Sequence, residues 1–160
     1  MQVFDASSMI YAWDNYPVRQ FPGLWEWMAR QIEEKELVMP SVALDEVSHK
    51  APDCSAWLKD NELTQLEINN EIVQRAMRIK HLLWIIDDNY HAKGVDENDL
   101  FIIATAHHHG LELVSNEAKQ NKLPDIPAKR KIPAVCDMDE VGVFCLDFLE
   151  YIKRSEEIFR

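Results

Sequence analysis

Short apolar segments alternate with helix-like stretches along this chain of 160 residues, and this alternation constrains the fold more than any other feature. The apolar segments are typical of strands because they are brief and bounded by polar residues or Pro. The expected strands cover residues 3–4, 37–39, 111–114, 134–136 and 143–145. Strands alternating with helices predict an α/β fold: three layers, with helices flanking a central, mostly parallel sheet of four to five strands. The length suits one domain spanning residues 1–160.

Apolar residues at spacings of three and four mark the helices between these strands. The expected helices cover residues 24–32, 42–47, 52–58, 68–84, 99–109 and 146–154. Ser41 is interpreted as the N-cap of the second helix and Asn98 as the N-cap of the fifth. Residues 82–86 could end a helix or open a short strand, and the helix is favoured. The polar region 116–133 carries three Pro and is expected to be a loop.

The formal charge of −11 argues against a simple nucleic-acid binder, which usually has a basic surface. It is compatible with a nuclease whose acidic cluster is neutralised by a divalent metal ion. Five of the 17 Lys and Arg gather in the expected loop and could contact substrate phosphates, or could form only a solvated loop: Lys119, Lys122, Lys129, Arg130 and Lys131.

The three cysteines form no CxxC pair, so neither a zinc knuckle nor a disulfide framework is expected. Buried free thiols in a reducing cytoplasm are the preferred interpretation. No apolar stretch approaches the length of a membrane span, and no signal peptide is visible. These features favour a cytoplasmic protein without membrane contact.

Four acidic residues occupy positions where a parallel sheet gathers functional groups. Asp5 ends the first strand, and Glu117 follows the third strand. Glu46 lies on the helix after the second strand, and Asp99 opens a later helix. Because the carboxyl ends of parallel strands meet at one edge, such carboxylates can converge. Carboxylates are the ligands that Mg²⁺ and Mn²⁺ prefer, and these ions promote phosphodiester hydrolysis.

Four segments resemble the PIN domain family, named after the N-terminal domain of PilT, and in particular its VapC-like toxin branch. The likeness lies in VFDASS at residues 3–8, the segment 40–50 with its helical Glu46, DLFIIATA at residues 99–106, and LVSNE at residues 113–117. These segments occur in the family's order over residues 1 to about 150. The chain departs from the family in having Glu117 where the fourth acid is usually Asp.

The resemblance implies a metal-dependent endoribonuclease that hydrolyses RNA with a metal-activated water, leaving a 5′-phosphate and a 3′-hydroxyl. Asp5, Glu46, Asp99 and Glu117 would be the catalytic residues and the ligands of Mg²⁺ or Mn²⁺. Ser7 and Ser115 would orient water or the carboxylates, and Asp96 could support Asp99 from one helical turn away. No organic cofactor is needed.

The same resemblance implies the toxin of a toxin–antitoxin pair, with RNA as substrate and a cognate antitoxin as partner. Because PIN domains often dimerise, a homodimer is also compatible with it. Two alternatives stay open: a catalytically degenerate PIN-like interaction module, favoured by the net charge and Glu117, and a DNA-directed nuclease on a related fold.

Overall fold

The computed structural model describes residues 1–160 and contains a five-stranded parallel sheet with strand order β3-β2-β1-β4-β5. The strands are β1 (Gln2–Phe4), β2 (Leu37–Pro40), β3 (Gln65–Leu66), β4 (Glu112–Val114) and β5 (Cys145–Leu146). Each neighbouring pair is parallel, so all five carboxyl ends lie at the same edge. This arrangement confirms the predicted α/β class and places β1, which precedes Asp5, at the centre of the sheet.

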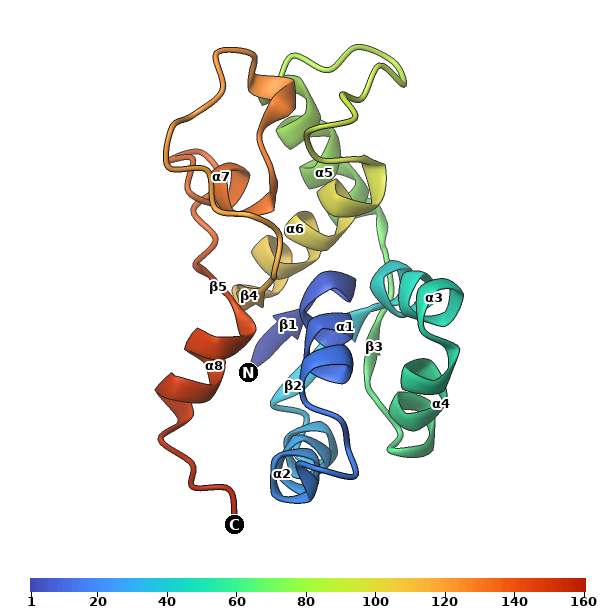
Figure 1. Ribbon diagram of the computed structural model, residues 1–160. Helices are drawn as coiled ribbons and strands as arrows, with labels where there is room; N and C mark the ends of the chain where they lie inside the picture. Colours follow the sequence, from blue (N-terminus) through green and yellow to red (C-terminus); the bar gives the residue numbers. More distant parts are fainter.

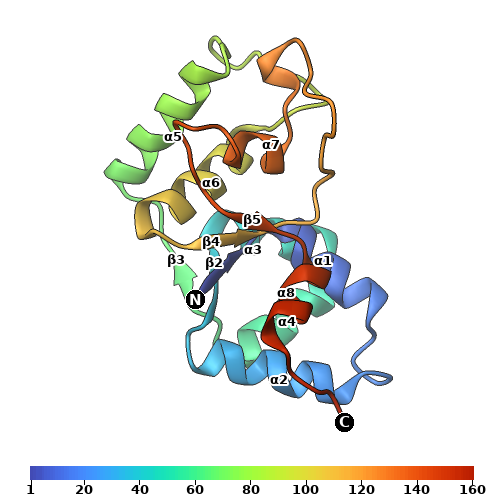
Figure 2. The ribbon, with the colours of Figure 1, turned by 90° about the vertical axis from the view of Figure 1, so that its left-hand side faces the viewer.

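Helices cover both faces of the sheet (Figure 1). Figure 2 shows α5, α6 and α7 on one side and α1, α2, α4 and α8 on the other. The helices are α1 (Ala6–Asn15), α2 (Pro22–Glu33), α3 (Ser41–Lys50), α4 (Pro52–Asp60), α5 (Asn70–Leu82), α6 (Glu97–His109), α7 (Ile132–Cys136) and α8 (Phe148–Ser155). Helix α3 packs against both α1 and α6, so it bridges the two layers. None of the helices combines the length and the apolar character that crossing a membrane requires.

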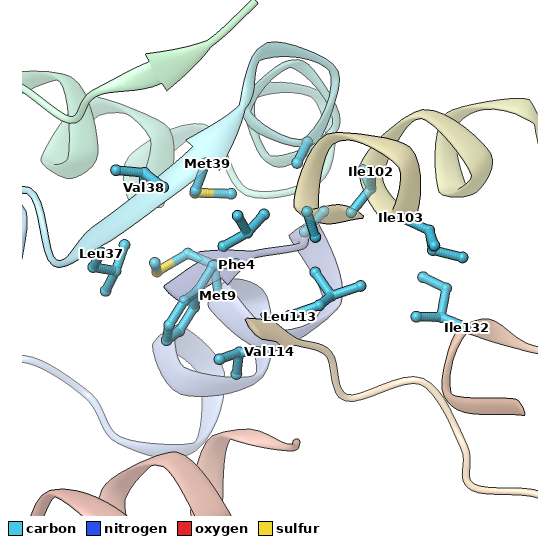
Figure 3. Packing of buried hydrophobic residues seen from close by; sticks show 14 of the residues in the cluster. Phe4, Met9, Leu37, Val38, Met39, Ile102, Ile103, Leu113, Val114 and Ile132 are labelled. Atoms are coloured by element: carbon cyan, nitrogen blue, oxygen red, sulfur yellow. The ribbon is translucent and has the colours of Figure 1, made fainter. Parts of the chain in front are cut away.

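A continuous cluster of 40 buried hydrophobic residues holds the sheet and helices together. The β1 side chains are central to it because both faces of the sheet are covered. Phe4 is fully buried and packs edge-on against Tyr151 of α8, with ring centroids 4.9 Å apart. On the other face Leu113, Ile102, Ile103 and Ile132 lie together (Figure 3). Truncating one such large side chain typically lowers the free energy of unfolding by about 3–5 kcal/mol. This packing therefore fixes the end of β1, where Asp5 lies.

The strand expected at residues 134–136 is wrong, because these residues belong to the short helix α7. Pro133 lies in its first turn, where the missing N–H of proline costs nothing. The last strand is β5, two residues later than its expected start. The two-residue strand β3 and the helix α1 were not expected at all, since neither shows a long apolar pattern.

Several helix ends also differ from the expectation. The N-cap of α6 is Asp96 rather than Asn98, because the Asp96 carboxylate accepts from Asp99 N at 2.8 Å. Helix α5 ends at Leu82, and Trp84 takes a left-handed conformation with φ of 59° that cannot continue a helix. Ser41 is the first helical residue of α3, and its N-cap is Pro40, which still belongs to β2.

Candidate active site

The register between β1 and β4 sets the position of Asp5. Phe4 pairs with Val114, so the next residues, Asp5 and Ser115, leave the sheet side by side. The backbone N–H of Asp5 donates to the Val114 carbonyl at 3.0 Å. Asp5 is also the N-cap of α1, and its Oδ1 accepts from Ser8 N at 2.8 Å. The carboxylate is therefore held between the end of a strand and the start of a helix.

Serine hydroxyls surround this carboxylate. The hydroxyl of Ser7 lies 2.9 and 2.8 Å from the two oxygens of Asp5. The hydroxyl of Ser115 donates to Oδ2 of Asp5 at 2.6 Å. Ser7 and Ser115 thus contact a single carboxylate from two different elements.

Asp5 is only 2% exposed, and burial raises the pKa of its carboxyl although the bonds from Ser115, Ser8 and Ser7 oppose this shift. A buried carboxylate without a cation strongly favours its neutral form. No Lys or Arg forms an ion pair with Asp5. A cation bound beside it would remove this penalty.

Asp99 lies in the first turn of α6 and forms a reciprocal capping box with Asp96. Its N–H donates to Asp96, and its Oδ2 accepts from Asp96 N at 3.0 Å. The pKa of Asp99 is raised to about 8, chiefly by burial and with contributions from the carboxylates of Asp96, Glu117 and Asp5, while the capping hydrogen bond opposes the shift. Three segments distant in sequence therefore place their negative charges close enough to influence one carboxyl group.

The remaining two acids are positioned differently. Glu117 is half-buried two residues after Ser115, and its N–H donates to the Ser115 hydroxyl at 3.2 Å. Glu46 lies on α3, the helix that contacts both α1 and α6. Its carboxylate forms an ion pair with Lys50 at 3.2 Å, one turn further along α3. The structure thus links Asp5, Asp99 and Glu117 electrostatically, while Glu46 has a competing partner.

The chemistry of this donor set fits a hard divalent cation, because it consists of carboxylate and hydroxyl oxygens around uncompensated negative charge. The side chains as placed contain no group of three or more His, Cys, Asp or Glu with the geometry to hold an ion. Holding one would therefore require rotation of carboxylates, in particular of Glu46 away from Lys50.

The basic stretch after Glu117 is anchored beside α6. Gln120 joins its two ends: its amide donates to Lys129 O at 3.1 Å and accepts from Lys131 N at 2.9 Å. Val95 N, next to Asp96, donates to Arg130 O at 3.0 Å. A Cβ at Gly94 would overlap the Ala128 carbonyl, so only glycine permits this close approach.

The five basic side chains of this stretch differ in whether they already have a partner within the protein. Lys119 is tied to Glu150 of α8 by an ion pair. Arg130 has a buried Nε without a hydrogen-bond partner, and Lys122 is exposed. No ion pair is formed by Lys122, Lys129, Arg130 or Lys131.

Two residues of the site were missed by the sequence interpretation. Ser8 donates its hydroxyl to Val114 O at 2.8 Å and its N–H to Asp5, linking β4 to α1. Asn116 donates its N–H to the Ser7 hydroxyl at 2.9 Å and accepts from Phe148 N at 3.0 Å. Asp is a preferred N-cap residue, so Asp5 could have revealed the start of α1, but the bond from the Ser8 hydroxyl to β4 has no such signal in the sequence.

Solved structures that are similar to this chain include chains of two VapBC complexes. The chain matches a chain in the DNA-bound VapBC complex from Salmonella typhimurium with a TM-score of 0.58 and 17% identity, over 92% of this chain and 97% of that one. It also matches a chain of VapBC2 from Rickettsia felis bound to a promoter DNA fragment, with a TM-score of 0.48 and 20% identity, over 81% and 96%. The first match shows that the PIN-like fold expected from the sequence is present.

No curated protein sequence matches the chain. One family model, described as "Domain of unknown function (DUF4411)", matches residues 2–159. Because this match covers nearly the whole sequence, the chain belongs to the family described as domain of unknown function DUF4411.

Proposed function

We propose that the chain is a Mg²⁺- or Mn²⁺-dependent endoribonuclease of the PIN type and acts as the toxin of a toxin–antitoxin pair. The observation that carries this proposal is the acidic cluster at the carboxyl edge of the sheet. Asp5 is buried in a shell of serine hydroxyls, and Asp99 has a pKa of about 8 that Asp5 and Glu117 help to raise. Ionisable groups whose pKa is strongly shifted by burial and by neighbouring charges are characteristic of functional sites.

Asp5, Asp99 and Glu117 would hold the divalent ion, joined by Glu46 once its carboxylate leaves Lys50. The bound ion would activate the attacking water and neutralise charge on the phosphodiester. Ser7 and Ser115 keep the Asp5 carboxylate in one orientation through their hydrogen bonds. Lys122, Lys129 and Arg130 of the anchored basic stretch would contact flanking phosphates of the RNA.

The toxin role is supported by the shared fold with a chain of a VapBC complex. In such a pair, we expect a cognate antitoxin to bind over the acidic cluster and block it. An Arg or Lys side chain of that partner could occupy the space of the metal ion, since carboxylate–cation hydrogen bonds are strong. Co-expression with the antitoxin should then relieve growth inhibition caused by the chain.

The test is cleavage of a mixed RNA pool by purified protein with Mn²⁺, Mg²⁺ or EDTA, beside an equal mass of single-stranded DNA. Asp5→Asn and Asp99→Asn should abolish cleavage, because each removes a negative charge from the proposed ion site. Asp60→Asn is the matched control, since Asp60 is an exposed residue at the end of α4. Full activity of either site variant, with contaminating nuclease excluded, would refute the site assignment. Preferential DNA cleavage would favour the DNA-directed nuclease.

A second candidate is a PIN-like interaction module without catalysis, and the Glu46–Lys50 ion pair favours it because it withdraws one carboxylate from the cluster. This candidate predicts no metal-dependent cleavage of any RNA and tight binding to a protein partner. Metal-dependent cleavage that Asp5→Asn abolishes would exclude it.

A further inference from the structure

A cavity of about 420 Å³ is lined by residues of the loop after β4, of α7 and of the segment that opens β5. Its volume falls in the range of ligand-binding pockets. The residues that matter for its chemistry are Lys119, Gln120, Asn121, Asp137, Phe144 and Cys145. Figure 1 shows the loop after β4, which supplies three of these residues, and helix α7, which Asp137 follows, on the same side of the molecule as β5. None of them has a role in the proposed hydrolysis.

The chain itself limits the distance between the cavity and the acidic cluster. Asn121 follows Glu117 by four residues, so their Cα atoms are at most about 14 Å apart. On the other wall, Cys145 begins β5, the parallel neighbour of β4, which leads to Ser115 and Glu117. A single-stranded RNA held at the acidic cluster can span a distance of this order with its neighbouring nucleotides.

The charges lining the cavity do not suit a phosphate group. Lys119 is already paired with Glu150, and Asp137 adds a negative charge. The polar groups that face the cavity are instead amides and a carboxylate, which match the edges of nucleobases. Gln120 is fixed by its bonds to residues 129 and 131, whereas Asn121 forms no side-chain hydrogen bond and stays available.

Phe144 supplies an aromatic surface at the same place. Its side chain is 58% exposed, which is unusual for phenylalanine. The guanidinium of Arg154 lies 5.2 Å from the ring centroid, and Arg154 is itself held by Glu112 at 3.1 Å. The ring is therefore supported from one side and open to a planar partner. Stacking on an aromatic side chain is the commonest way in which proteins hold unpaired bases.

We propose that this cavity is a subsite for one unpaired nucleobase of the RNA substrate, stacked on Phe144 and read by Asn121 and Asp137. The inference rests on the proposed ribonuclease function and extends it to substrate specificity. A carboxylate accepts hydrogen bonds and donates none, so Asp137 favours bases with an exocyclic amine: adenine, cytosine or guanine. Uracil offers only one donor on this edge, its N3–H, between two carbonyl oxygens that repel a carboxylate, so it is disfavoured.

The experiment has two readouts: sequencing of product ends from a single-stranded RNA library, and equilibrium binding of short labelled oligoribonucleotides. Wild-type protein should disfavour uracil at one position near the cut and bind uracil-containing oligonucleotides more weakly. Asp137→Asn should lose this preference, since its amide can also donate. Phe144→Leu should lower kcat/KM and the binding affinity by at least about fivefold, the loss expected for one stacked base.

Phe21→Leu is the matched control, because Phe21 is 42% exposed next to α2 and lies outside the cavity. Thermal unfolding of each variant shows whether the fold is retained. If the wild-type protein cleaves RNA and both cavity variants keep its rate and its base preference, the subsite proposal is overturned and the nuclease proposal stands. Base-selective binding that depends on Asp137, without cleavage, would support the subsite and refute the nuclease. Absence of both cleavage and binding would overturn both.

Discussion

The hydroxyl of Ser115, at the end of β4, donates a 2.6 Å hydrogen bond to Oδ2 of Asp5, at the end of β1. These residues are 110 positions apart in the sequence, yet both are almost fully buried. The bond exists because the two strands are parallel neighbours in a register that pairs Phe4 with Val114. It joins the central strand to the segment that carries Glu117, and so it organises the candidate site.

Replacing Ser115 with Ala should destabilise the protein by about 1–3 kcal/mol, because a buried carboxylate loses a hydrogen-bond donor. The pKa of Asp5 should rise further, since this bond is the strongest effect opposing its burial. Urea unfolding measures the first effect, and the pH dependence of RNA cleavage measures the second. The control is Ser155→Ala, which removes an exposed hydroxyl at the end of α8. Equal stability of the two variants would contradict the structural role of Ser115.

The stability of the metal-free protein should fall as the pH rises from about 4 to about 8. Over this interval folded Asp99, with a pKa of about 8, keeps a proton that the unfolded chain, with a value near 3.8, has released. The unfolded state then binds fewer protons, so raising the pH favours unfolding. Asp5, whose pKa is also raised, likewise makes the stability fall as the pH rises. Asp99→Asn should flatten the profile of thermal stability against pH.

Added Mg²⁺ should raise the melting temperature more at about pH 8 than at about pH 5.5, because the ion and the proton compete for the same carboxylates. Differential scanning fluorimetry with and without EDTA measures this difference. The Asp5→Asn variant should show little response at either pH. A response that is equal at both pH values, or greater in acid, would argue against these carboxylates as ligands.

The two candidate caps of α6 can be separated by mutation. Asp96→Ala should cost about 1 kcal/mol, because it removes the side chain that caps Asp99 N. Asn98→Ala should have a smaller effect, since Asn98 is exposed in the first turn and caps nothing. Denaturant midpoints of the two variants provide the comparison. A larger loss of stability for Asn98→Ala would instead identify Asn98 as the N-cap, as expected from the sequence.

Glu46→Gln should raise the Mg²⁺ concentration needed for half-maximal RNA cleavage, because it removes a candidate ligand from α3. Its effect on stability should be small, at most about 0.5 kcal/mol, since the Lys50 partner is exposed. Asp45→Asn is the matched control, because Asp45 is the exposed neighbour on the same helix. Identical metal titrations for both variants would show that Glu46 takes no part in ion binding.

Local patterns in the sequence located most of the architecture. Brief apolar segments marked β1, β2 and β4, since buried strands need continuous apolar residues. The same reasoning failed for residues 134–136, where three apolar residues fit a strand or a short helix equally well. Pro133 and the packing of α7 against α6 and β5 resolved that ambiguity in favour of a helix.

The sequence by itself determined the α/β class and placed Asp5 and Glu117 after strands, because both follow from the period of apolar residues and from chain order. Only the tertiary structure decided the strand register, the Ser115–Asp5 bond and the Glu46–Lys50 pair. It also decided the high pKa of Asp99, which depends on burial and on carboxylates from distant segments. Burial and charge proximity are properties of atoms that meet in space, so no local pattern of residues contains them.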